Sequence, residues 1–508
     1  MNRRDFIRLA GTATAGLAHG RSRPSRSAPG SVRPNVLFIT VDDLRPELGC
    51  YGVDAVRSPR IDRLAAEGAV FRRAYCAQGV CNPSRVSLLT GLRPDSHRVE
   101  DNETHFRRFR PSIVTLPQAF SRSGYLSACL GKVFHGTLPD PPSWQRYAAP
   151  PDDLPVYMAK ETRVRQARRE SVARDRGYSQ AWINAYLRGP ATEASDTPDS
   201  AHWDGALADL AVAMLRDLGP SQPFFLGLGF TKPHLPYVAP KRYWDLYERG
   251  AIPLAANRRV PRGAPPFAVN NMTELASHED FVGVPNPHEG GVDDDSARLL
   301  KHGYYACVSF GDAQIGRVLD ALEALGLRER TIVVLVGDNG YKPGEHGSWG
   351  KMTNYEVDVR VPLIVSLPGR GRAGLSVPAL VEMVDLYPTL CELAAIEPPH
   401  PTEGTSLVPL LAEPSRPWKK AAFSQYARGF TYRFMGRTLR TDRYRLVEWR
   451  DRIDGPLVAV ELYDHATDPG EDVNIAGDPA HKDLVAALSA ELAAGWPAAR
   501  PEGQDPAR

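Results

Sequence analysis

Four continuous apolar runs constrain the fold of this chain more than any other feature of its sequence. They cover residues 35–41, 223–230, 331–338 and 362–368. Because successive positions are apolar instead of alternating, each run indicates a strand that is buried on both faces of a sheet. Ahead of the third run, one apolar helical stripe is formed by Ile315, Val318, Leu319 and Leu322. Strands that alternate with helices predict an α/β fold with a mixed, mostly parallel sheet flanked by helices.

The chain has 508 residues, more than one compact domain usually contains. We expect a main domain at 34–396, which ends before the proline-rich break that begins at residue 397. Short β-like runs at 444–449 and 457–463 and a helical stretch at 482–494 predict a smaller C-terminal α+β subdomain at 397–508, with a short antiparallel sheet and a terminal helix. The Pro- and Gly-rich segment 252–287 reads as a long surface loop, a kind that usually serves recognition.

The first 33 residues read as an export signal and leader. Arg3 and Arg4 precede a mildly apolar stretch and an Arg-, Ser- and Pro-rich linker. This pattern resembles a bacterial twin-arginine signal, and the alternative is a basic, alanine-rich disordered start. We therefore expect the twin-arginine export machinery as a partner and a periplasmic or secreted location. No other apolar run reaches the ~20 residues that spanning a bilayer needs, so we expect no stable membrane span.

Charge and cysteine usage exclude several classes of protein. The formal net charge is +2, which gives no overall basic field for nucleic-acid binding. The six cysteines show no CxxC or zinc spacing and no disulfide framework, so most are expected to be small buried residues.

Oxygen donors stand directly after two of the predicted strands. Asp42 and Asp43 follow the first run, and Asp338 and Asn339 follow the third. Ligands of open α/β sheets gather at such strand ends. Oxygen donors without His or Cys favour Ca²⁺ or Mg²⁺ over zinc, although each pair by itself is more often a turn or a helix cap.

Three further segments place cationic side chains near predicted strand ends. Residues 131–135 read as a strand with Lys132 and Phe134 on one face and His135 at its exit. Residues 231–236 hold His234 between two prolines, and residues 344–351 end at Lys351. Isolated residues of these types in loops are usually only solvated or hydrogen-bonded.

Residues 81–91 carry the most specific motif in the chain. They begin Cys81-Asn82-Pro83-Ser84-Arg85 and end Leu89-Thr90-Gly91. The segment resembles the sulfatase signature C-x-P-S-R-x-x-x-L-T-G and has the same residue type at every position that the signature specifies. The alternative for the cysteine is a buried residue at a helix start. Pro83 near a helix start also fits an anion site, because backbone N–H groups there are unpaired.

These segments, in this order, resemble the type I sulfatases of the alkaline-phosphatase superfamily, over about residues 34–476. Within that family, four segments look like the iduronate-2-sulfatase branch; they are 42–52, 131–135, 232–236 and 344–356. The resemblance implies an alkaline-phosphatase-like sheet, a sulfated carbohydrate as substrate, and a sulfuric ester hydrolase activity. One position departs from that branch, which has His where this chain has Asn339; either can ligate, so the departure weakens only the transfer of substrate identity.

The resemblance also implies roles for individual residues. Cys81 would be oxidised to formylglycine by a maturation enzyme, and one hydroxyl of its hydrate would attack sulfur while the second later expels sulfate. One Ca²⁺ would be held by residue 81 together with Asp42, Asp43, Asp338 and Asn339. Arg85 would hold the hydrate, and the sulfate oxygens would be bound by Lys132 and Lys351. His234 would protonate the leaving alcohol, and His135 would take the proton from the second hydroxyl.

Three residues that flank the predicted pocket are candidates for contact with the sugar: Asp140, Trp144 and Tyr341. Packing beneath surface loops is an equally good interpretation of them. Two alternative functions remain at this stage. One is a phosphomonoester, phosphodiester or phosphonate hydrolase on the same scaffold. The other is a secreted glycan-binding protein without catalysis, although no expected catalytic position is missing.

Overall fold

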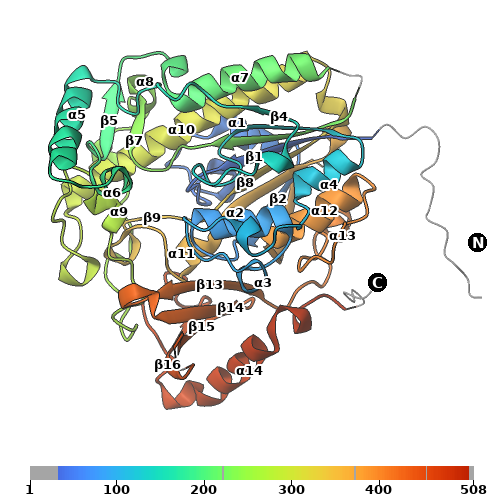
Figure 1. Ribbon diagram of the computed structural model, residues 1–508. Helices are drawn as coiled ribbons and strands as arrows, with labels where there is room; N and C mark the ends of the chain where they lie inside the picture. The colour runs from blue at the N-terminus through green and yellow to red at the C-terminus, as the bar shows by residue number, and fades with distance from the viewer. Residues whose placement is uncertain (1–32, 220–221, 371–372, 454, 503–508) are drawn as a thin grey trace, which may run out of the picture. The chain divides into compact units, whose positions relative to one another are not determined.

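An eight-stranded sheet runs through the middle of the part of the chain that the computed structural model describes, which is residues 33–219, 222–370, 373–453 and 455–502 (Figure 1). The strand order is β12 (Leu375–Glu382), β2 (Ala69–Tyr75), β11 (Arg360–Ser366), β8 (Thr331–Gly337), β1 (Asn35–Val41), β6 (Phe224–Phe230), β3 (Leu126–Gly131) and β4 (Arg146–Ala148). β11 runs antiparallel to both of its neighbours, and every other neighbouring pair is parallel. The predicted mixed, mostly parallel sheet is therefore confirmed.

Helices cover both faces of this sheet. Alternate side chains of each strand point to opposite faces, so both faces carry apolar side chains that the helices bury. One face of β1, which carries Leu37 and Ile39, packs against α1 (Pro59–Ala66), α7 (Trp203–Leu218) and α10 (Asp294–Ala324). The other face, with Val36 and Phe38, packs against α2 (Cys81–Thr90), α4 (Leu116–Arg122) and α12 (Leu386–Leu393). Burial on both faces explains why the strand sequences are apolar at successive positions.

A second sheet follows near the C-terminus. It has four antiparallel strands in the order β13 (Ala422–Arg428), β14 (Phe434–Arg440), β15 (Tyr444–Asp451) and β16 (Leu457–Asp464), and its apolar residues pack with α14 (Lys482–Ala498). The predicted short antiparallel sheet and terminal helix are present. The described residues from Arg33 onward cluster as one compact unit, so the subdomain boundary at residue 396 stays a prediction.

The remaining elements are short or lie on connecting segments. They are α3 (Pro94–His97), α5 (Lys160–Asp175), α6 (Gln180–Tyr186), α8 (Lys241–Trp244), α9 (Thr273–Ala276), α11 (Glu356–Val359), α13 (Val408–Ala412), the paired strands β5 (Thr192–Ser195) and β7 (Tyr237–Pro240), and the hairpin β9 (Lys342–Pro343) and β10 (Trp349–Gly350). Among the described residues, no helix combines the length and apolarity that crossing a bilayer requires. Apart from Arg33, the predicted signal and leader lie outside the described residues.

Candidate active site

The strand register brings the predicted site residues to one edge of the large sheet. Val41 of β1 lies opposite Phe230 of β6 and Gly337 of β8, so the chain leaves these three parallel strands at the same level. Gly131 of β3 pairs with Gly229 at nearly the same height. The residues that follow these strands, 42–43, 231–234, 338–339 and 132–135, therefore converge at the carboxyl edge of the sheet.

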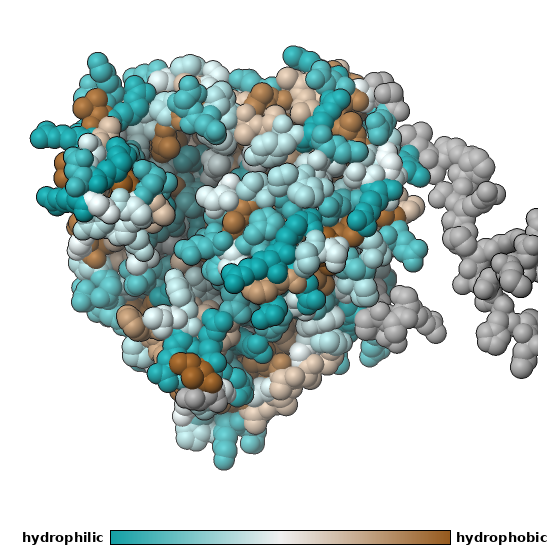
Figure 2. Space-filling view, viewed as in Figure 1, coloured by the Kyte–Doolittle hydropathy of each residue, from teal (hydrophilic) through white to brown (hydrophobic). Residues whose placement is uncertain are grey.

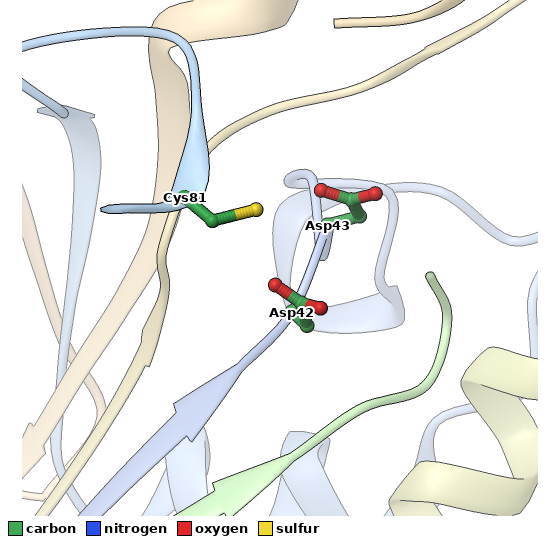
Figure 3. A group of neighbouring side chains, drawn as sticks. All are labelled: Asp42, Asp43 and Cys81. Carbon is green, nitrogen blue, oxygen red and sulfur yellow. The ribbon is translucent and has the colours of Figure 1, made fainter. Parts of the chain in front are cut away.

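Cys81 reaches the same edge from β2, whose direction matches that of β1. The chain leaves β2 at Tyr75, and Cys81 is the first residue of α2. In Figure 3 its sulfur points toward the carboxylates of Asp42 and Asp43, which follow β1. One ligand atom from each of these three residues lies within 4.8 Å of the other two, and each of the three residues is at most 1% exposed.

Arg85, one turn along α2, ties the helix to two of the sheet-edge carboxylates. Its Nε lies 2.8 Å from Asp338 Oδ2, and its Nη2 lies 3.2 Å from Asp42 Oδ1. Nη1 donates to the carbonyls of Lys132 and Val133. The side chain is fully buried, so Arg85 in this structure organises the carboxylates rather than facing solvent.

Two lysines neutralise the remaining negative charge. Lys132 Nζ lies 2.5 Å from Asp42 Oδ2, and Lys351 Nζ lies 2.5 and 2.6 Å from the two oxygens of Asp43. With Arg85, three cations thus face the three carboxylates of the site. Such balance is what keeps several buried charges in one place.

Asn339 is the member of this set with an unsatisfied buried atom. Its Nδ2 donates to Asp43 Oδ1 at 2.7 Å, whereas its buried Oδ1 has no hydrogen-bond partner within the described part of the chain. Asp338 Oδ1 accepts from the backbone N–H groups of Asp43 and Asn339. An unpaired acceptor oxygen beside three carboxylates is the kind of donor set that binds a hard cation, because these oxygen atoms could all coordinate the ion.

The pKa values of the site carboxylates diverge although all are buried. Burial raises the pKa of Asp43 to about 7, against the effect of Lys351 and with the help of Asp42 and Asp338. Burial acts on Asp42 in the same direction, but Lys132, His234 and Arg85 together hold its pKa well below the ordinary range. For Cys81, burial and then the Asp42 carboxylate raise the pKa of the thiol well above its usual value. In this structure residue 81 is therefore a neutral thiol.

His234 lies beside a residue that sequence reasoning missed. Its Nδ1 pairs with the Leu235 carbonyl at 2.6 Å, and its Nε2 lies 3.2 Å from Glu274 Oε1 and 3.8 Å from Asp43 Oδ2. Glu274 belongs to α9, within the loop predicted at 252–287, and also lies 3.9 Å from Lys351. The length of that loop was the one signal in the sequence that pointed toward this contact.

The surroundings of His234 favour its neutral form. Burial, and then Lys351, lower the pKa of its imidazole to about 3, while Glu274 and Asp42 oppose the shift. To act as an acid, His234 would have to gain a proton at the site, and Glu274 is the carboxylate placed to stabilise it.

Asp204 of α7 fixes the backbone ahead of His234 and was also missed. Its carboxylate accepts from the N–H groups of Thr231 and Lys232, at 2.9 and 2.7 Å. Lys232 Nζ donates back to the carbonyls of His234 and Pro236. Lys232 therefore shapes the loop and does not join the site's charge cluster.

The strand predicted at 131–135 is wrong beyond its first residue. β3 ends at Gly131, whose left-handed φ of 71° turns the chain out of the sheet. A side chain at this position would also collide with the Gly229 carbonyl. After the turn, Lys132 points to Asp42, whereas Phe134 packs in the core and His135 is half-buried, with Nδ1 3.1 Å from Thr137 Oγ1. Burial, and then Lys132, lower the pKa of His135 to about 3.

The three residues predicted to contact sugar all have partners within the protein. Asp140 is 1% exposed, forms an ion pair with Arg107 at 2.5 Å and accepts from Ser143. Trp144 packs against Phe134 and Phe225 in the core, and buried Tyr341 stacks on Tyr304. These contacts account for the three residues structurally, and their contact with substrate stays a prediction.

Comparison with known families agrees with this geometry. The family model described as Sulfatase matches residues 34–396, and the model described as N-sulphoglucosamine sulphohydrolase, C-terminal, matches residues 344–495. The chain belongs to the sulfatase family. A curated relative of this sulfatase, iduronate 2-sulfatase of Mus musculus, is 33% identical over 527 aligned residues, which cover 89% of this chain and 93% of the relative. Another, a sulfatase of Formosa agariphila, is 30% identical and covers 91% of this chain and 86% of that protein.

Solved structures share the fold over most of this sulfatase. The phosphonate monoester hydrolase from Silicibacter pomeroyi superposes with a TM-score of 0.70 at 26% identity, covering 91% of this chain and 95% of that one. A protein solved in complex with its substrate D-glucosamine-2-N,6-O-disulfate has the same TM-score at 22% identity, covering 93% and 100%. The fold is thus that of the alkaline-phosphatase superfamily, and the relatives make this sulfatase a sulfuric ester hydrolase.

Proposed function

We propose that this sulfatase hydrolyses sulfate esters of carbohydrates, with residue 81 in its formylglycine form as nucleophile and one Ca²⁺ beside it. The observation that carries the proposal is the convergence of Cys81 with Asp42 and Asp43, with ligand atoms within 4.8 Å of one another at the carboxyl edge of the sheet. The names of the curated relatives support a sulfated carbohydrate as substrate, because iduronate 2-sulfatase is among them.

The donor set fits Ca²⁺ chemically. Asp42, Asp43, Asp338 and Asn339 offer only oxygen atoms, and Asn339 Oδ1 is buried without a partner among the described residues. Residue 81 would complete the set. When bound, Ca²⁺ would supply positive charge against which a sulfate ester and its attacking oxygen are held.

The charge balance of the site suggests a role for the two lysines. Three carboxylates already face Arg85, Lys132 and Lys351. A divalent cation added to this cluster leaves a surplus of positive charge even when the Glu274 carboxylate beside Lys351 is counted, and an anionic sulfate ester would offset that surplus. Lys132 and Lys351, each within about 2.6 Å of a carboxylate, are then available to bind sulfate oxygens and to stabilise charge in the transition state.

The remaining roles are those that the family resemblance implies. Formylglycine at residue 81 would supply a hydrated aldehyde, whose two hydroxyls provide for attack on sulfur and for the later release of sulfate. Arg85 fixes the start of α2 relative to Asp42 and Asp338. His234 would deliver a proton to the leaving alcohol, with Glu274 stabilising its protonated form, and His135 would accept the proton of the second hydroxyl.

Phosphonate ester hydrolysis is the second candidate function, because the phosphonate monoester hydrolase from Silicibacter pomeroyi shares the fold over nearly its whole length. The decisive experiment compares aryl sulfate with aryl phosphate and aryl phosphonate esters at matched concentrations. It then measures sulfate released from a panel of defined sulfated mono- and oligosaccharides. We expect sulfate esters to be turned over fastest. A higher kcat/KM for a phosphonate ester would overturn the assignment.

Maturation and export complete the proposal. Formation of formylglycine from Cys81 would require a maturation enzyme, and the twin-arginine-like signal would direct the protein to the periplasm or to the outside of a bacterial cell. Changing Arg3 and Arg4 to lysine tests the export step, since the sulfatase should then stay in the cell.

A further inference from the structure

Helix α5 (Lys160–Asp175) concentrates positive charge on the surface of the protein. Its sequence holds six Lys and Arg against three Asp and Glu, whereas the whole chain has a net charge of only +2. Only Thr162 and Ala173 of the helix are buried. Since most helices owe their stability to an apolar face packed on a core, a helix with so little burial and so much charge calls for another explanation.

Internal ion pairs neutralise only half of these cations. Arg165 and Arg169 share Glu279, at 3.0 and 3.1 Å, and Arg174 lies 3.6 Å from Glu170. Three other side chains are exposed and form no hydrogen bond or ion pair with any described residue; they are Lys160, Arg163 and Arg168. We call these three the α5 cations.

The α5 cations lie on the outward side of the helix. Lys160, Val164 and Arg168 are spaced four residues apart and so form one row, away from the buried Thr162 and Ala173. Val164 in this row is 59% exposed. The row is about 12 Å long, because each helical residue rises about 1.5 Å. An extended polymer lying along it would meet Lys160 and Arg168 together, with Arg163 to one side of the row.

The segment that leads into α5 reaches the active site. Leu154, Pro155, Val156 and Met158 line a cavity of about 290 Å³ whose wall also includes Asp42, Lys132 and His234. The Met158 N–H is held by Glu193 at 2.5 Å, immediately before the helix begins. The helix thus starts at the rim of the cavity that contains the catalytic side chains.

A second connection runs through the body of the helix. Arg169 donates to the Arg188 carbonyl, and Arg188 lies 3.4 Å from Glu274, the partner of His234. Figure 1 shows α5 beside α6 and α9, and in Figure 2 the surface over α5 is mostly hydrophilic, with a recess between it and the surface over α2. A chain that enters the site from this side would pass the α5 cations.

We propose that the outward face of α5 is a binding surface for a sulfated polysaccharide, and that it holds the charged part of the polymer that extends beyond the ester being cleaved. The anionic partner follows from charge complementarity with cations that have no partner among the described residues. The identity of that partner as the substrate polymer rests on the proposed function. Binding at this surface would speed encounter and depend steeply on salt, because its contacts are exposed charges.

The experiment measures equilibrium binding of dextran sulfate to the full-length protein, at low and at physiological ionic strength. The test variant is Arg163→Glu/Arg168→Glu. The matched control is Arg216→Glu/Lys482→Glu, which makes the same change in charge at exposed positions of α7 and α14. Unchanged thermal unfolding of both variants establishes that neither has lost its fold.

We expect the test variant to bind dextran sulfate at least about 25-fold more weakly at low salt, because removing each of the two cations near a polyanionic surface costs about fivefold and the two added carboxylates repel the polymer. Its salt dependence should also be shallower, and the control should bind like the wild type. Equal loss in both variants, or no loss in the test variant, would overturn the proposal. Tighter binding of anionic phospholipid vesicles or of DNA than of dextran sulfate would overturn it too. Because no turnover is measured, a failure of the proposed catalytic function is recognised separately.

Discussion

Replacing Arg85 by methionine should show how much the active-site carboxylates depend on one buried cation. Methionine keeps much of the side-chain volume but removes the contacts to Asp338 at 2.8 Å and to Asp42 at 3.2 Å. Asp42 keeps Lys132 at 2.5 Å, so it remains paired. Asp338 keeps only backbone N–H donors, and it becomes the carboxylate left without a cation.

The expected loss of stability has a ceiling. A buried charge that loses its partner typically costs about 3–5 kcal/mol. Asp338 can instead take up a proton, which at pH 7 costs about 4 kcal/mol relative to an unfolded chain with the ordinary pKa of 3.8. We therefore expect Arg85→Met to lower the free energy of unfolding by about 3–4 kcal/mol at pH 7.

The loss of stability in Arg85→Met should depend on pH. Burial already raises the pKa of Asp338 above 3.8 in the wild type, against the effect of Arg85, so the loss of Arg85 should raise it further. The added penalty exists above the wild-type pKa of Asp338 and shrinks as the pH falls toward it. The gap between wild type and variant should shrink by at most about 1.4 kcal/mol for each pH unit below 7.

The assay is denaturant-induced unfolding in the presence of a chelator, followed by tryptophan fluorescence at pH 7 and pH 5. The double variant Arg85→Met/Asp338→Asn should recover at least about 1 kcal/mol of the loss, because the orphaned charge is gone. A loss below about 1 kcal/mol at pH 7, or a gap that widens at pH 5, would refute the reasoning.

Four further predictions concern single side chains. Burial lowers the pKa of His97 to about 3 from 6.5, so stability should fall as the pH drops through that interval, and His97→Gln should flatten the unfolding free energy there. His234→Ala should slow alkyl sulfates about 10²- to 10⁴-fold and aryl sulfates much less, and equal slowing would contradict its role as acid. Glu274→Gln should reduce alkyl sulfate turnover about 10- to 100-fold with little effect on aryl sulfates, whereas no change would exclude it as the partner of His234. Asp140→Asn should lower the free energy of unfolding, measured by thermal denaturation, by about 1–3 kcal/mol and leave KM unchanged. A raised KM at unchanged stability would instead indicate that Asp140 contacts the sugar.

Strand positions could be predicted because burial on both faces leaves a clear sequence signal. The run at 35–41 coincides with β1, and the run at 331–338 extends one residue beyond β8; parallel pairing then requires that Asp42 and Asp338 meet. The motif at 81–91 likewise coincides with the start of α2. Local sequence and family pattern sufficed for these residues because each follows directly from a strand or helix end.

Residues on irregular backbone could not be predicted in the same way. Glu274 reaches His234 from a four-residue helix inside a long loop, and no periodic pattern specifies where such a loop folds. The end of β3 depends on the conformation of Gly131, which a strand-like alternation conceals. The partners of Asp140 and Lys232 are likewise set by tertiary contacts that have no local signature.

The central claim, that residue 81 acts as formylglycine, is tested most directly by mass spectrometry of active enzyme purified from its native host. Trypsin should release residues 74–85, a peptide that contains Cys76 as an internal control. After reduction and alkylation, the account predicts an alkylated Cys76 and, at residue 81, the mass of formylglycine in place of cysteine. Fully active enzyme in which both residues are alkylated cysteines would contradict it.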